Sequence, residues 1–367
     1  MTATGGASTT IVSLGVITIN AGGSNITVTA NNAAAGSNTG ITQTGTITNN
    51  AVGSNISFIS NNLINQTGAI ALVANAGAPA ANVVYDTTAG IRGSNITTGN
   101  LTFTTGANSV INFVARSAGS AIATGAIGTS TVSLPGAVTI DNTFGCTTAP
   151  CTPTTGFITT ANAATLATAS AGVTIASVIN ASGDITIRGI SSSAAGVTYS
   201  AAINSASRGI TIAGTSVGAA STSYGIHGSA AAGVVSASNT TNGFVSYTGT
   251  STLANLASDG IRTVAGATIT GGAGVNLFAD GFSGNIITGA LIRNSGTISG
   301  VTVNAYGNVS LAGATNYGVD GMRIIAGRGI AAGTTTGGNV TAVGTLTNTG
   351  GVIGVSMAAP SLSLIHI

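Results

Sequence analysis

The chain has 367 residues, of which 56 are glycine, and its 8 cationic and 6 anionic side chains are all arginine or aspartate. Lysine and glutamate, the usual residues of solvated helix faces, are absent, which excludes long amphipathic helices. A charged fraction of 4% with 43% hydrophobic residues excludes disorder, so we expect a packed interior under a surface of threonine, serine and asparagine.

The same composition excludes several partners and sites. The arginines are spread singly from Arg92 to Arg328 and form no cluster that would neutralise neighbouring phosphates, so nucleic acid is not an expected partner. No stretch approaches the roughly 18 unbroken apolar residues of a spanning helix, so no transmembrane segment is expected in this chain. With only 2 histidines and 2 cysteines, we expect neither a metal site nor a cofactor.

Short strand units recur along the chain, each opened by Asn, Asp or Gly. Apolar residues then alternate with Thr or Ser, a period-two pattern that places Ile and Val on one face of a strand. The units are 25–28, 55–58, 95–97, 100–103, 184–187, 209–212, 308–311 and 339–341. Their unequal intervals fall in the range of solenoid coils whose connecting loops differ in length.

This pattern predicts an all-β fold, a right-handed parallel β-helix (β-solenoid), as one repeat region over residues 1–360. Each coil of such a fold lays its Val or Ile on the coil below, at the ~4.8 Å spacing of paired strands. The turn asparagines can then stack as amide ladders. A β-sandwich is disfavoured, because it would show strands at short, regular intervals with distinct aromatic core positions.

Cys146 and Cys151 are the 2 cysteines of the chain. A metal site needs about four ligands, and two isolated thiols without a nearby histidine do not supply them. We therefore expect a local disulfide that closes a small surface loop, which would imply an oxidising compartment. The alternative is a pair of free thiols.

A second motif, Gly-Ile-Arg or a close variant, ends at Arg92, His227, Arg262 and Arg323. Its simplest interpretation is a strand whose cationic side chain points outward. The sharper hypothesis is a row of surface contact residues available to an anionic glycan. The sequence does not decide whether the four side chains share a face.

Enzymes also occur on β-helices, where they use clustered carboxylates, and glycosidases need a carboxyl pair about 5 to 9.5 Å apart. Asp259 and Asp280 are separated by roughly the length of one coil and form the one pair that stacking could bring onto a common face. The alternative is that each aspartate caps a turn of the backbone. We expect no catalytic residue and no enzyme.

The last residues, 361–367, read SLSLIHI and contain none of the Gly and Asn residues that recur in the preceding chain. They resemble translated sequencing-adapter DNA, which would make this tail an assembly artefact. The alternative is a short final strand.

Two segments resemble a known family. Residues 291–313 read LIRNSGTISGVTVNAYGNVSLAG, and residues 63–77 read LINQTGAIALVANAG. Their Asn-x-x-Gly, Gly-x-Ile-Thr-Ile and Val-x-Ala-x-Gly-x-Val steps resemble the repeat region of filamentous-haemagglutinin-like exoproteins and autotransporter passengers. The resemblance is one of composition and period and spans almost the whole chain. It implies an internal fragment of a larger bacterial surface protein.

From the resemblance we expect a structural and adhesive repeat region, extracellular or on the bacterial outer surface. It would display loops for attachment to host-cell or matrix glycans or proteins. A solenoid without polar caps leaves edge strands, so end-to-end self-association is also expected. One alternative is a β-helix polysaccharide-active enzyme that uses Asp259 and Asp280. Another is an ice-binding solenoid, which needs a continuous Thr-x-Thr ladder.

Overall fold

The computed structural model describes residues 2–5, 12–20, 25–32, 40–50, 55–74, 81–88, 95–105, 110–129, 132–145, 156–157, 169–217, 223–251, 259–280, 286–288, 291–294, 301–305, 309–311, 315–316, 322–326, 339–342, 346–347, 355–358 and 361–362. Within these residues the chain forms strands and no helix, which confirms the predicted all-β fold. The strands belong to two compact units, Met1–Thr168 with Gly172–Thr186, and Ala169–Ala171 with Ile187–Ile367.

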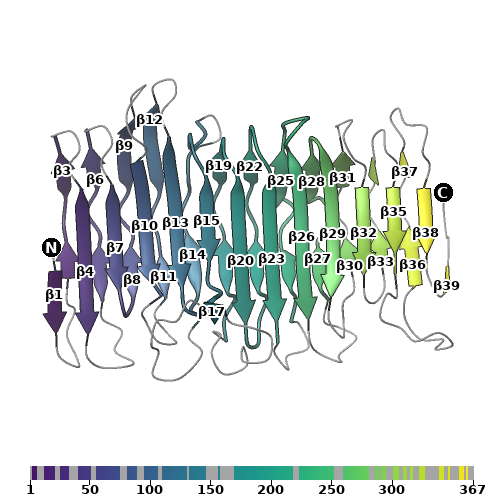
Figure 1. Cartoon of the computed structure of the whole chain (residues 1–367), viewed down its shortest axis with the longest axis horizontal. Helices are drawn as coiled ribbons and strands as arrows, with labels where there is room; N and C mark the ends of the chain where they lie inside the picture. Colours follow the sequence, from purple (N-terminus) through teal and green to yellow (C-terminus); the bar gives the residue numbers. More distant parts are fainter. Residues whose placement is uncertain are drawn as a thin grey trace. The chain divides into compact units, whose positions relative to one another are not determined.

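The first unit is a parallel β-helix whose coils contribute strands to three sheets, with strands of one sheet lying side by side in chain order (Figure 1). Its sheet A has the order β1 (Thr2–Gly5), β4 (Ile26–Asn32), β7 (Ile56–Ser60), β10 (Ala81–Thr87), β13 (Ile111–Ser117) and β15 (Val138–Asp141). Its sheet B has the order β2 (Val12–Leu14), β5 (Ile41–Gln43), β8 (Ile64–Gln66), β11 (Ile96–Thr97), β14 (Ile122–Thr124) and β18 (Val173–Ile175). Its sheet C has the order β3 (Ile17–Ile19), β6 (Ile47–Asn49), β9 (Ile70–Ala74) and β12 (Leu101–Thr105).

Sheet C of the first unit continues beyond β12 through an isolated bridge. Ile127 pairs in parallel with Leu101 on one side and with Ile179, the first residue of β19 (Ile179–Ala181), on the other. A further pair of strands departs from the parallel pattern, because β16 (Phe144–Gly145) and β17 (Gly156–Phe157) pair antiparallel.

The second unit repeats the same plan. Its sheet A has the order β20 (Ile185–Ser191), which begins at the unit boundary, β23 (Ile210–Ser216), β26 (Phe244–Ser251), β29 (Gly274–Asp280), β32 (Val301–Ala305), β35 (Met322–Ile325) and β38 (Val355–Ala358). Its sheet B has the order β21 (Val197–Tyr199), β24 (Ile226–Gly228), β27 (Ile261–Thr263), β30 (Ile286–Thr288), β33 (Val309–Leu311), β36 (Asn339–Ala342) and β39 (Ser361–Leu362). Its sheet C has the order β22 (Ile203–Ser205), β25 (Val234–Ala237), β28 (Thr268–Gly271), β31 (Leu291–Asn294), β34 (Thr315–Asn316) and β37 (Leu346–Thr347).

The coils differ in length although their strands stay in register. Val301 pairs with Met322 across a short coil, whereas Ile210 pairs with Val245 across a much longer one. The extra residues lie in the connections between strands, as the unequal spacing of the sequence repeats predicts. The final strand β39 pairs in parallel with β36, so Ser361 and Leu362 belong to sheet B.

The interior is filled by stacked apolar side chains, because alternate residues of each strand point inward. In the first unit the rings of Phe58 and Tyr85 stack with centroids 5.2 Å apart, and the Phe113 ring lies tilted against Tyr85 at 5.6 Å. The buried Tyr85 hydroxyl donates to Oε1 of Gln66 at 2.8 Å, and Nε2 of Gln66 donates to Oε1 of Gln43 at 3.0 Å. This buried chain of polar groups satisfies the one polar atom that the aromatic stack carries.

An asparagine ladder runs along sheet A of the first unit. The main-chain N–H and Nδ2 of Asn55 both donate to Oδ1 of Asn25, at 3.0 Å each. Asn82 repeats these two bonds to Asn55 at 2.9 and 3.0 Å, and Nδ2 of Asn112 donates to Oδ1 of Asn82 at 3.2 Å. The N–H of Ala137 donates to Oδ1 of Asn112 at 3.1 Å. The expectation that turn asparagines stack as amide ladders is confirmed here.

In the second unit, buried serines at the ends of sheet A strands differ in whether their hydroxyl groups are hydrogen-bonded. Ser216 and Ser251 pair in register at the ends of β23 and β26, and both are 0% exposed. Within the described residues their Oγ atoms have no hydrogen-bond partner. Ser191, at the end of β20, instead donates to the carbonyl of Ser170 at 2.7 Å and accepts from the N–H of Ala194 at 2.9 Å.

Replacing Asn55 by alanine should lower the free energy of unfolding by about 1–2 kcal/mol, because the Nδ2 bond to Asn25 is lost and two donors of Asn82 lose their acceptor, whereas the main-chain N–H of residue 55 still donates to Asn25. Urea unfolding of the variant measures the change. The matched control is Asn65→Ala, a half-buried position of sheet B outside the ladder, with an expected change within about 0.5 kcal/mol. Equal losses in both variants would contradict the ladder's contribution.

Ser216→Ala should leave thermal stability unchanged or raise it by up to about 1 kcal/mol, because it removes a buried hydroxyl that lacks a partner. Ser191→Ala should lower stability by about 1–2 kcal/mol, because it removes a hydroxyl that donates to the carbonyl of Ser170 and accepts from the N–H groups of Ser193 and Ala194. Thermal unfolding of the two variants provides the comparison. A loss in Ser216→Ala as large as that in Ser191→Ala would show that the Ser216 hydroxyl is satisfied.

Candidate functional site

Two of the Gly-Ile-Arg motifs stack on one another in the second unit. Ile226 pairs with Ile261, and His227 pairs with Arg262, in the adjacent parallel strands β24 and β27. Both isoleucines are 0% exposed and fill the interior. Because side chains alternate along a strand, His227 and Arg262 face outward as neighbours. The two motif residues therefore lie side by side on the same sheet.

Steric crowding explains why the motif begins with glycine. A Cβ on Gly225 would lie 2.5 Å from the main-chain N of Thr250 and 2.5 Å from the carbonyl oxygen of Gly260. Any side chain there would push the end of β26 away from the start of β24. The strand that carries His227 can therefore begin only with glycine at this turn.

Four side chains then form what we call the Tyr–His–Arg cluster: Tyr224, His227, Asp259 and Arg262. The Tyr224 and His227 rings have centroids 4.7 Å apart and planes inclined by 50°. The Arg262 guanidinium carbon lies over the Tyr224 ring, 5.3 Å from its centroid. Nη1 of Arg262 also donates to Oδ2 of Asp259 at 3.3 Å. The Asp259 side chain is 1% exposed and the Arg262 side chain 42%, so a buried carboxylate holds an arginine that is partly exposed to solvent.

The electrostatics of the cluster favour a neutral imidazole. Partial burial lowers the pKa of His227 below the ordinary value of a histidine, about 6.5, and the positive charge of Arg262 lowers this pKa further. At neutral pH the cluster thus holds one guanidinium, one carboxylate and an uncharged imidazole. One added proton on His227 would give it a net positive charge.

The other two motif residues lie elsewhere. Arg323 is in β35 of sheet A, where it pairs with Thr302, so it is on a different sheet from His227 and Arg262. Arg92 lies outside the described residues. The proposed row of four therefore reduces to the His227 and Arg262 pair within the described part of the chain.

The aspartate pair considered for catalysis does not stack in register. Asp280 ends β29 of sheet A and pairs with Thr250 of the preceding coil. Asp259 precedes β27 of sheet B and holds Arg262. Because Asp259 follows Thr250 in the chain, it is separated from Asp280 by less than one full coil. The two aspartates therefore occupy different positions of the coil.

Sequence reasoning missed a row of alternating charge in the first unit. Arg116 pairs in register with Asp86 on one side and with Asp141 on the other. Each aspartate accepts hydrogen bonds from the N–H and hydroxyl of the threonine two residues later, at 2.8 and 2.6 Å. The repeated Asp-x-Thr at 86–88 and 141–143 was the available signal, and it agrees with the interpretation of aspartates as turn caps.

Cys146 and Cys151 lie outside the described residues, so the disulfide stays a prediction. The antiparallel strands β16 and β17 flank the segment that contains them. Among the residues that the structure describes, no three His, Cys, Asp or Glu side chains come together as metal ligands would. In the same residues no helix has the length and apolar character to cross a membrane.

Comparison with known proteins returned no family model, no curated protein and no solved structure that matches this chain.

The chain should lose stability as pH falls from about 6.5, and His227→Gln should remove part of this loss. The folded-state pKa of His227 is lowered, so the unfolded chain binds the proton more tightly. This stabilising contribution is complete above about pH 6.5 and is lost as pH falls through the lower folded-state pKa. Urea unfolding at several pH values from about 5 to 8 measures it. Parallel pH profiles for the two proteins would contradict the prediction.

Proposed function

We propose that this chain is a structural and adhesive β-solenoid of a bacterial secreted or outer-surface protein. It displays loops and outward sheet faces for attachment to host-cell or matrix glycans or proteins. The repeat resemblance of the sequence supports this assignment. So does the chemistry of the outward faces.

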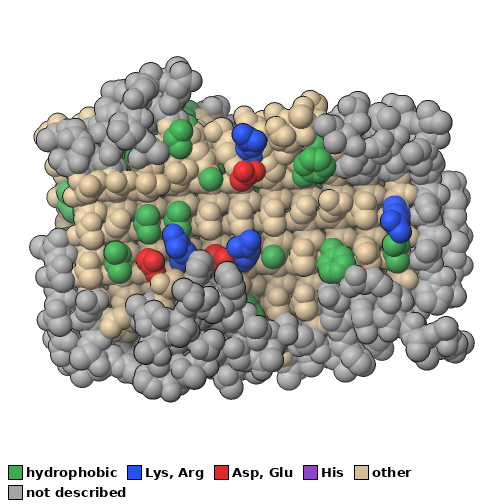
Figure 2. Space-filling view, viewed as in Figure 1, with side chains coloured by type: hydrophobic (Ala, Val, Ile, Leu, Met, Phe, Trp, Pro, Cys, Tyr) green, Lys and Arg blue, Asp and Glu red, His purple; other side chains and the backbone are tan. Residues whose placement is uncertain are grey.

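The outward face of sheet A in the second unit carries uncharged polar side chains in register. Thr211, Ser246, Asn276 and Thr302 occupy equivalent positions on four successive strands, β23, β26, β29 and β32. Figure 2 shows a face on which uncharged polar side chains and backbone predominate and charged side chains are few. A surface with hydroxyl and amide groups every ~4.8 Å offers the neutral hydrogen-bonding partners that sugars and peptides require.

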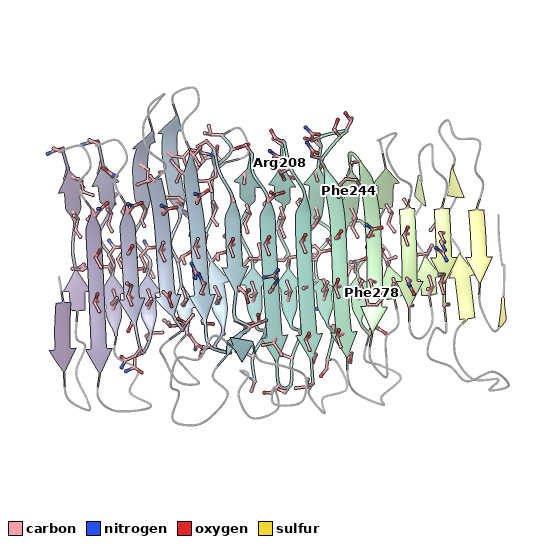
Figure 3. The ribbon with its side chains drawn as sticks, viewed as in Figure 1. Arg208, Phe244 and Phe278 are labelled. Carbon is pink, nitrogen blue, oxygen red and sulfur yellow. The ribbon has the colours of Figure 1, made fainter. Side chains whose placement is uncertain are left out.

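Aromatic side chains interrupt this polar face at separated points. Phe244 begins β26, and Phe278 lies near the end of β29, each half-buried (Figure 3). Phe278 pairs in register with Thr248 and Asn304. An amphipathic sheet face of this kind suits adhesion, because a ring offers apolar contact beside polar groups.

The single observation that carries the proposal is that three of the described carboxylates serve the fold while neutral polar side chains face outward. Asp86 and Asp141 cap turns, and Asp259 anchors Arg262. The enzyme alternative would need Asp259 to leave this ion pair for catalysis with Asp280. An ice-binding face would need an unbroken threonine ladder, but Thr29 pairs with Ile59.

Display of residues 1–367 on a non-adherent bacterium should increase its retention on matrix glycoproteins and cultured cells severalfold. The matched control is the same bacterium carrying the display anchor alone. Equal retention would contradict the adhesive function. Release of reducing ends from polysaccharides by the purified chain, abolished by Asp259→Asn, would instead favour the enzyme alternative.

A further inference from the structure

We propose that the Tyr–His–Arg cluster is a subsite for the acid group of an anionic polysaccharide, and that its affinity rises as pH falls. The inference rests on the adhesive function proposed above and names the ligand class for one site on the solenoid. Three features support it: an arginine that is already ordered, a histidine beside it, and neighbours that suit a sugar.

Arg262 is held in place before any ligand arrives. Asp259 accepts a hydrogen bond from Nη1 at 3.3 Å, and the Tyr224 ring supports the guanidinium face at 5.3 Å. A guanidinium has five N–H donors, so one bond to Asp259 leaves donors on its exposed side for a carboxylate or sulfate. Because the side chain is already ordered, binding loses less conformational entropy than it would with a mobile surface arginine.

His227 supplies the pH dependence. It lies beside Arg262 on the adjacent strand, at the ~4.8 Å spacing of paired strands. The groups that face it within the described residues are Tyr224 from its own turn, Arg262 from β27 with its anchor Asp259, and the uncharged Thr198 from β21. An acid group placed between the two cations favours protonation of the imidazole, which the arginine alone opposes.

The surroundings favour a sugar acid over other anions. Tyr224 is half-exposed, and Thr198 continues the row on the other side of His227, so an aromatic edge and a hydroxyl flank the paired cations. One guanidinium and one imidazole suit a single acid group, whereas a phosphate backbone needs several cations in a row. A polymer of acidic sugars presents such groups one at a time, and many copies of the chain on a surface would add avidity.

The probe is a defined oligogalacturonate, titrated calorimetrically into the 367-residue chain at about pH 5.5 and about pH 7.5 and constant ionic strength. We expect binding at least about fivefold tighter at the lower pH, with uptake of a proton seen as a buffer-dependent heat. A neutral galactan oligomer of the same length should not bind. A sulfated oligosaccharide arm shows whether the subsite also accepts sulfate. Equal binding of the neutral oligomer would overturn the proposal.

Single variants test the contributions of Arg262 and His227 to binding separately. Arg262→Gln should abolish binding at both pH values, and His227→Gln should keep the affinity at neutral pH but lose its rise on acidification. The double variant Asp259→Asn with Arg262→Gln removes both charges together, so no buried carboxylate is left unpaired, and it should also fail to bind. Arg208→Gln is the matched control, an exposed arginine that precedes β23 of sheet A (Figure 3).

Unchanged oligogalacturonate affinity in the double variant, or an unchanged pH dependence in His227→Gln, would overturn the subsite. Failure of the subsite is distinguishable from failure of the adhesive function. If the displayed chain still adheres while the oligogalacturonate does not bind, only the subsite is wrong. If the displayed chain does not adhere at all, the proposed function is wrong as well.

Discussion

Parallel pairing of each strand with the equivalent strand of the next coil is the constraint on which the structure of both units depends. The pairing fixes register, and register decides which side chains meet. Ile226 lies on Ile261 inside, so His227 must lie on Arg262 outside. A one-residue slip would exchange the two faces and bury the charged pair, which the interior cannot accommodate. The candidate site is therefore a direct product of backbone pairing.

Much of this fold could be predicted from the sequence, because its signals are local and repeated. Alternation of Ile or Val with Thr or Ser marks each strand, and the asparagine that opens many of them predicts the ladder through Asn55 and Asn82. Local alternation did not say which of the Gly-Ile-x motifs stack on one another, nor that Arg323 belongs to another sheet than His227 and Arg262.

Contacts between residues of different coils could not be predicted, because they depend on how many residues separate two neighbouring strands of a sheet. Asp259 and Asp280 were expected to lie one coil apart, but coil length varies through the connections, and Asp280 pairs with Thr250 instead. The buried hydrogen bonds between Tyr85, Gln66 and Gln43 could not be predicted either, because they join three strands whose register no local pattern specifies. The role of Tyr224 as a support for Arg262 was also not predictable, because it needs two coils to be seen together.

The asparagine ladder explains why so few charges occur in this chain. Stacked coils place equivalent residues next to one another, so a repeated unit must tolerate contact with a copy of itself. Asparagine, threonine and serine do so, because each both donates and accepts hydrogen bonds. A lysine or glutamate repeated in this way would face its own charge at ~4.8 Å, and like charges directly opposite destabilise a sheet. In the first unit, Asp86, Arg116 and Asp141 pair in register with alternating charge, so each of these charges meets its opposite on the adjacent coil. Stacking equivalent residues on successive coils is thus harmless for a neutral amide and costly for an ion.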